Sequence, residues 1–162
     1  VGQIMKDKMF LRGAAESGIA EEKFSQLALE KAGSEDVKLF GQKMIDDHIQ
    51  LGTAMAPVAD AMGIRLPKEM NKADQEAYEK LNALSGSDFE TAYLTQMVMM
   101  HHKAMRNFRV EANSVTDPQL SEFVAKGEHT LHEHLVAVNK LAKEKGIPLP
   151  ARAGKPASPP PV

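Results

Sequence analysis

Cysteine and tryptophan are absent from the 162 residues of this chain, and only 5% of the residues are aromatic. Without cysteine the chain has no disulfide, no thiol nucleophile and no thiolate metal ligand. So few aromatic rings provide little surface on which nucleic-acid bases could stack. The formal net charge of -2 gives no basic patch for nucleic acid. No apolar run reaches the about 20 residues of a membrane span. We therefore expect neither a nucleic-acid partner nor a membrane-spanning segment.

The remaining composition is that of a globular protein with one unusual excess. Hydrophobic residues make up 43% and charged residues 26%, and ten residues are methionine. This balance and length fit one domain with a real hydrophobic core. The first residue is Val1 rather than methionine, which fits either a removed signal peptide or a sequence trimmed at its start.

Apolar residues recur every three or four positions in four long segments, which is the pattern of helices with one buried face. The segments begin near Asp7, Val37, Phe89 and Pro118, and glycine, proline or helix-capping residues separate them. Residues 72–84 predict a further short helix, and Pro57 should kink or locally break the second segment. No strand pattern competes with these helices.

The sequence therefore predicts an all-α four-helix bundle over residues 1–149, with a longer connection between the second and third long helices. This connection could cross over the bundle, as in ferritin-like folds, or fold back locally. Residues 150–162 are rich in proline, and we expect them to form a disordered or extended tail.

Each of the four apolar faces is interrupted near its middle by one residue that can bind a metal. These residues are Glu21, His48, His101 and His134. Their distances from the neighbouring loops place them at similar heights in a bundle, given the rise of about 1.5 Å per residue. One carboxylate and three imidazoles suit a first-row transition metal such as zinc, copper or iron, among which the pattern does not choose. The alternative is a structural one, in which Glu21 and the histidines form a buried hydrogen-bonded network without metal.

Several neighbouring residues have a lesser place in this prediction. Met97 and Met44 each lie one turn before a predicted ligand, where thioethers would favour copper but are more often core residues. His102 lies on a different helix face from His101, and we interpret it as a flanking residue. His129 and His132 share a further face and are expected to be solvated, or to form a second site at the surface.

Ferritin-like oxidases carry a Glu-x-x-His pair on each of two helices, and this pair is missing here. The residues three positions before the histidines are Ile45, Val98 and Leu131. Phosphate-binding loops and nucleophile elbows are also missing from the sequence. The pattern thus favours a binding protein over an enzyme, with Tyr93 and Asp47 as expected hydrogen-bond partners of the ligands.

Two sets of segments carry a resemblance to a known family. In the first half they are Ala20-Glu21, Met44-Ile45-Asp46-Asp47-His48 and Gly63-Ile64-Arg65-Leu66-Pro67, and in the second half the run from Ser85 to Tyr93, His101 and Leu131-x-x-His134-Leu135. Over about residues 9–141 the chain resembles the exported, ferritin-like domain of unknown function numbered 4142, found in bacterial outer-membrane and periplasmic proteins. Glu90 stands where that family usually has aspartate after phenylalanine. The Met-x-His-His run ending at His102 is similar to a second exported helical family, which is linked to copper.

The resemblance implies a periplasmic or otherwise exported four-helix bundle, and it brings no established reaction. Together with the four interior residues, it leads us to predict metal binding, storage or a stress-related role without catalysis. The alternative remains a structural or interaction module whose buried Glu–His network fixes the helix register.

Overall fold

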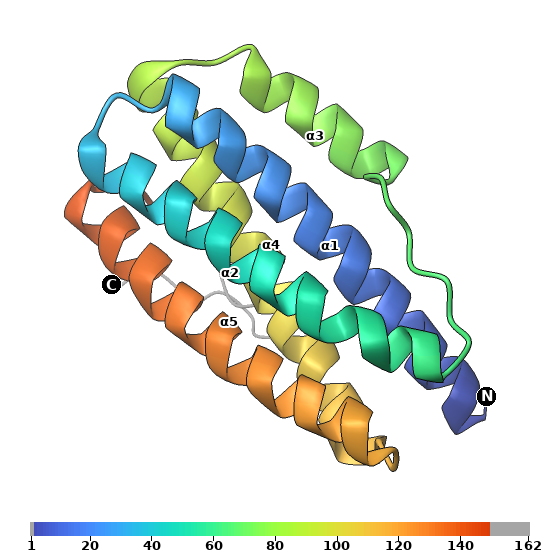
Figure 1. The fold of residues 1–162 in the computed structure, drawn as a ribbon. Coiled ribbons are helices and arrows are strands. Elements are labelled where there is room, and N and C mark those ends of the chain that lie inside the picture. Colours follow the sequence, from blue (N-terminus) through green and yellow to red (C-terminus); the bar gives the residue numbers. More distant parts are fainter. Residues whose placement is uncertain (1, 150–162) are drawn as a thin grey trace, which may run out of the picture.

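Five helices form the computed structural model, which describes residues 2–149 and contains no strand among them (Figure 1). The helices are α1 (Gln3–Lys31), α2 (Glu35–Ala61), α3 (Lys72–Asn82), α4 (Gly86–Ser114) and α5 (Pro118–Glu144). The predicted all-α class is confirmed, and α3 corresponds to the predicted short helix. The proline-rich tail predicted at 150–162 lies outside the described residues. None of the described helices is long and apolar enough to cross a membrane.

The four long helices pack side by side, and α3 lies against the outer side of α1 (Figure 1). α1 contacts α2 and α4, while α5 contacts α4 and α2. The connection that contains α3 returns along the whole length of the helices, so α2 and α4 run in the same direction (Figure 1). The connection therefore crosses over the bundle, which is one of the two alternatives between which the sequence did not decide.

Local sequence signals explain most helix ends. Asp117 caps α5 by accepting a hydrogen bond from the backbone of Leu120, and Pro118 follows as its first residue. Gly63 and Gly146 follow α2 and α5 with positive φ angles of 67° and 68°, a conformation that glycine adopts without strain. Pro57 does not end α2, which continues to Ala61, so the expected local break is not present.

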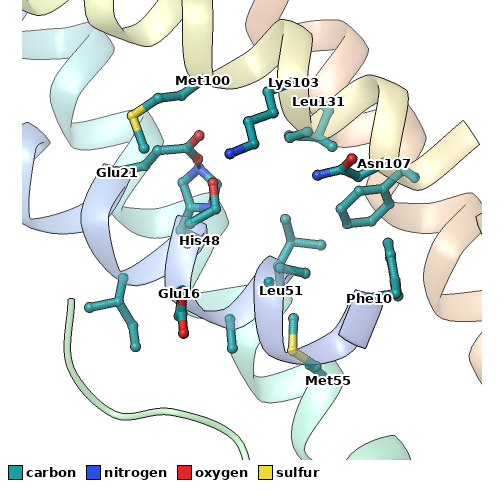
Figure 2. Close-up of a pocket in the computed structure, with 18 of the residues that line it drawn as sticks. Phe10, Glu16, Glu21, His48, Leu51, Met55, Met100, Lys103, Asn107 and Leu131 are labelled. Atoms are coloured by element: carbon teal, nitrogen blue, oxygen red, sulfur yellow. Dashed lines mark ion pairs between the residues drawn. The ribbon is translucent and has the colours of Figure 1, made fainter. Parts of the chain in front are cut away.

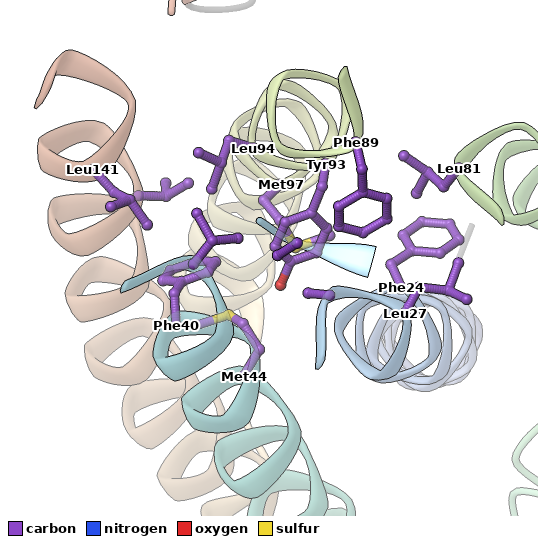
Figure 3. Close-up of a cluster of buried hydrophobic side chains, with 14 of the residues drawn as sticks. Phe24, Leu27, Phe40, Met44, Leu81, Phe89, Tyr93, Leu94, Met97 and Leu141 are labelled. Carbon is purple, nitrogen blue, oxygen red and sulfur yellow. The ribbon is translucent and has the colours of Figure 1, made fainter. Parts of the chain in front are cut away.

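The hydrophobic core consists of two clusters. The cluster toward the α1–α2 turn includes Phe24, Tyr93 and Leu94, and Leu81 of α3 reaches it from outside (Figure 3). The cluster toward the α4–α5 turn includes Leu11, Leu51, Met55, Phe108, Leu120 and Leu131. Glu21, His48, His101 and His134 belong to neither cluster. Their positions along the four helices place them between the two clusters.

A buried carboxyl group lies near each end of the molecule. Glu90 accepts hydrogen bonds from the backbone of Gly33 and Ser34 at 2.8 Å, and thereby caps the start of α2. At the other end, Glu111 of α4 faces Asp7 of α1, and both are less than 5% exposed. Burial and the neighbouring Asp7 raise the pKa of Glu111 to about 8.

The packing of Gly127 predicts a sharp difference between two glycine substitutions. A Cβ atom at Gly127 would lie 2.3 Å from Cε2 of Phe108, whereas one at Gly52 meets nothing within 4 Å. We expect Gly127→Ala to lower the free energy of unfolding by about 1–3 kcal/mol through overpacking. Gly52→Ala should raise it by up to about 1 kcal/mol through helix propensity. Urea unfolding of both variants measures these changes, and equal effects would contradict the described contact.

The raised pKa of Glu111 predicts a contribution to the free energy of unfolding that depends on pH. A carboxyl whose pKa is higher in the folded than in the unfolded state favours folding when protonated. This term is complete below about pH 4.5 and is lost as the pH rises through about 8. Relative to wild type, Glu111→Gln should therefore gain about 1–2 kcal/mol in unfolding free energy between pH 5 and pH 8.5, after allowance for solvent screening of the pair. Urea unfolding at both pH values measures the gain, and the exposed Glu122→Gln should show none.

Candidate metal centre

One side chain from each long helix enters the polar layer between the two clusters: Glu21 from α1, His48 from α2, His101 from α4 and His134 from α5. Their exposed fractions are 1%, 8%, 0% and 0% respectively. The sequence prediction that these residues meet in the interior is therefore confirmed. Whether they hold a metal is a separate question, which depends on where their protons lie.

His101 and His134 face each other directly, with 3.1 Å between Nε2 of His101 and Nδ1 of His134. The outer nitrogen of each ring is engaged elsewhere. Nδ1 of His101 lies 2.7 Å from the backbone carbonyl of Met97, which can only accept a hydrogen bond. Nε2 of His134 lies 2.7 Å from Oδ2 of Asp47. We therefore assign the proton of each neutral ring to its outer nitrogen.

This assignment leaves two unprotonated nitrogens pointing at each other. Burial lowers the pKa of His101, and it also lowers that of His134, to about 4, so both rings are neutral at neutral pH. Two facing lone pairs repel unless a cation lies between them. Two nitrogens on one tetrahedral zinc, each at about 2.0–2.1 Å from it, would be about 3.3 Å apart. The observed separation of 3.1 Å is close to this value.

Glu21 and His48 form the other half of the layer. Oε2 of Glu21 lies 2.5 Å from Nε2 of His48. Burial would raise the pKa of Glu21, but His101 and His48 outweigh it and lower the pKa to about 2. Burial would lower the pKa of His48, but Glu21 outweighs it and raises the pKa. Without a metal these two side chains are a buried ion pair.

One ring nitrogen from each of His48, His101 and His134 lies within 4.8 Å of the other two. Three such nitrogens, with outer hydrogen bonds that orient two of the rings, match the way proteins hold transition metals. Oε1 of Glu21 is buried and accepts no hydrogen bond within the described part of the chain. It lies 3.9 Å from Nδ1 of His101.

The other residues singled out in the sequence have different surroundings. Asp47 is bonded to His134, as expected of a ligand's partner, but the hydroxyl of Tyr93 pairs with Ser25 at 2.6 Å instead. Met44 and Met97 belong to the hydrophobic core. His102 is half-buried beside the layer. His129 is 79% exposed at its side chain, as expected of a solvated residue, and lies 3.8 Å from Glu133.

A pocket of about 850 Å³ leads from the surface to this layer. Glu21 and His48 form part of its wall, whereas His101 and His134 do not. Figure 2 shows these two side chains beside Met100 and Lys103, with Leu51 and Phe10 further along the pocket. Small solutes can therefore approach the layer from the Glu21–His48 side.

Neither this pocket nor the Asp7–Glu111 pair at its far end was predicted from the sequence. Glu111 follows His101, Ala104 and Phe108 at helical spacing, so its burial could have been predicted. Its pairing with Asp7 could not, because the two residues lie on different helices.

No curated protein matches the chain. Among solved structures, the crystal structure of a candidate secreted protein of the family DUF305 from Streptomyces coelicolor is similar in fold, with a TM-score of 0.77. The similarity covers 90% of this chain and 97% of that protein, at 14% sequence identity. A sequence model described as a domain of unknown function, DUF4142, matches residues 2–141. Because this match spans most of the chain, the protein belongs to the DUF4142 family.

Proposed function

We propose that this protein is an exported, ferritin-like four-helix bundle that binds one transition-metal ion in its core. His48, His101 and His134 supply imidazole ligands, and Glu21 supplies the carboxylate. The proposal is supported above all by the two neutral histidines that face each other with unprotonated nitrogens, 3.1 Å apart. A bound cation would turn this repulsive contact into a favourable one.

Binding, storage or a stress-related role is favoured over catalysis, because four protein ligands would fill a tetrahedral shell. Imidazole is a good ligand for zinc, copper and iron alike, so the donor set supports this group of metals rather than one of them. The two negative charges of Glu21 and Asp47 would offset the charge of a divalent ion in the interior.

An exported location is supported by two observations. The similar solved structure is of a protein described as a candidate secreted one. The sequence segments around His48 and His134 resemble exported bacterial proteins. We therefore propose the bacterial periplasm, or another exported location, as the place where the metal is bound.

The contact between Glu21 and His48 favours a second candidate, a structural module without metal. A buried ion pair can fix the register of packed helices without any ligand. In that case chelators leave the thermal stability unchanged, whereas the metal-binding proposal predicts a higher melting temperature with metal by mass action.

The metal proposal predicts the effects of single ligand substitutions. We expect the purified chain to bind Zn²⁺, Cu²⁺ or Fe²⁺ with a dissociation constant of micromolar or below, measured by calorimetry after chelator treatment. His101→Ala should weaken the binding by on the order of 100-fold, and Glu21→Gln by on the order of 10-fold, because each removes a donor or its charge. His129→Ala is the matched control, since His129 is exposed and distant from the layer. Absence of micromolar binding for all three metals refutes the proposal.

The hydrogen bond between Asp47 and His134 predicts that Asp47, which is not itself a proposed ligand, also affects metal affinity. Asp47→Asn removes the charge that orients His134 and should lower metal affinity by about 10–100-fold. Asp46→Asn is the matched control, because the exposed Asp46 accepts a hydrogen bond from the exposed Gln42 rather than from a histidine. Equal affinities of the two variants would show that Asp47 does not support the metal through His134.

A further inference from the structure

The pocket has the size and lining of a binding site for a small organic molecule. Its volume of about 850 Å³ is within the range of roughly 300–1,000 Å³ that is usual for such sites. Much of its wall is apolar and comes from four helices, including Phe10, Leu51, Met55, Phe108 and Leu131. Phe10 and Phe108 meet edge to face with ring centres 4.8 Å apart.

Three glycines inside helices keep this space free. Gly13, Gly18 and Gly52 all line the pocket, although glycine within a helix costs about 1 kcal/mol relative to alanine. A Cβ atom at Gly13 or Gly52 would meet nothing within 4 Å, and one at Gly18 would meet only Nδ1 of His48, at 3.8 Å. By contrast, Gly41 and Gly127 are required by close packing. Packing does not explain the three pocket glycines, but an occupied pocket would.

The far end of the pocket holds a buried acceptor without a donor. Glu111 lines the pocket and is only 4% exposed, and its Oε2 has no hydrogen-bond partner among the described residues. A buried oxygen of this kind carries an energetic cost until a donor reaches it. The carboxyl groups of Glu111 and Asp7 share a hydrogen bond, which leaves only Oε2 of Glu111 without a donor within residues 2–149, and the charge of Lys6 also acts on Glu111. Asp7 and Lys6 both belong to α1. Of these, Asp7 is buried beside it while Lys6 is exposed.

The charges around the pocket favour a cationic ligand. Five carboxyl groups line it, Glu16, Glu21, Glu22, Asp74 and Glu111, together with Lys6, Lys103 and His48, which pairs with Glu21. Carboxyl groups therefore outnumber cationic side chains by five to three, and the buried group with an oxygen that lacks a donor is a carboxyl. An ammonium group is the donor that best matches a buried carboxyl pair, and the edge-to-face rings nearby suit its apolar chain.

We propose that this pocket binds a cationic amphiphile, a primary amine on an apolar chain, with its ammonium group beside Glu111 and Asp7. The chain lies along Phe10, Phe108 and Leu131 toward the Glu21–His48 end. The site does not depend on the metal. Glu111 lies ten residues beyond His101 on α4, a distance of about 15 Å along the helix.

Calorimetric titration of the full chain with octylamine, octanol and octanoate at pH 7 tests the proposal, with chelator present throughout. We expect octylamine to bind at least tenfold more tightly than octanol, and octanoate not to bind measurably. A pKa of Glu111 near 8 adds a second readout. An ammonium group would lower this pKa, so binding should release up to about one proton, seen as different heats in phosphate and Tris buffers.

Two substitutions separate the polar end of the site from its apolar wall. Glu111→Gln should weaken octylamine binding about tenfold and abolish the proton release, while leaving octanol binding unchanged. Gly13→Leu should block octylamine and octanol alike, because Gly13 lines the pocket and a Cβ atom there meets nothing within 4 Å. Ala112→Leu, on the exposed side of α4 outside the pocket, is the control. Thermal unfolding confirms that each variant is folded.

Three outcomes would overturn the proposal. Equal affinity for octylamine and octanol would show that the pocket recognises only an apolar chain. Tighter binding of octanoate would assign the polar end to a lysine rather than to Glu111. Unchanged octylamine binding by Gly13→Leu would place the amine outside the pocket. None of these results bears on the metal, because chelator is present in every titration.

Discussion

The facing nitrogens of His101 and His134 are the constraint around which the interior is arranged. Each ring is held from outside, one by the carbonyl of Met97 and the other by Asp47, so neither can turn its proton toward the other. Burial keeps both rings neutral. The two hydrophobic clusters leave room between them for this polar layer. A layer of this kind is unfavourable unless something links its members, and the proposed metal ion would be such a link.

The contents of this layer could be predicted from sequence because each of its members interrupts an apolar stripe. Glu21 and the three histidines are the ligand-type residues at mid-helix positions of four amphipathic segments, and the helical repeat carries them to one height. The helix ends were equally predictable where capping chemistry is explicit, as at Asp117. The four interior residues and the helix ends could be predicted because both depend on the spacing of residues along the chain.

Other features depend on contacts between helices, and local spacing does not contain them. The bond from His134 to Asp47 joins α5 to α2, and Tyr93 turns to Ser25 rather than to the histidines. The connection through α3 is held against the bundle by Leu81, which packs into the hydrophobic core. The pocket depends on the absence of side chains at Gly13 and Gly52. From sequence alone, a glycine within a helix indicates only a lower helix propensity, because its neighbours in space are not known.

The crossover connection affects the order in which the parts of this protein can assemble. The polar layer needs one residue from every long helix, from Glu21 on α1 to His134 on α5. The segment that contains α3 separates the pair α1–α2 from the pair α4–α5 along the chain. Local helix pairs can form early, but the layer closes only when both pairs dock, which is a contact of large sequence separation. A nascent or truncated chain thus cannot present the complete set of donors. Under the proposed metal binding, an ion that requires all four side chains would be bound only after the whole domain has folded.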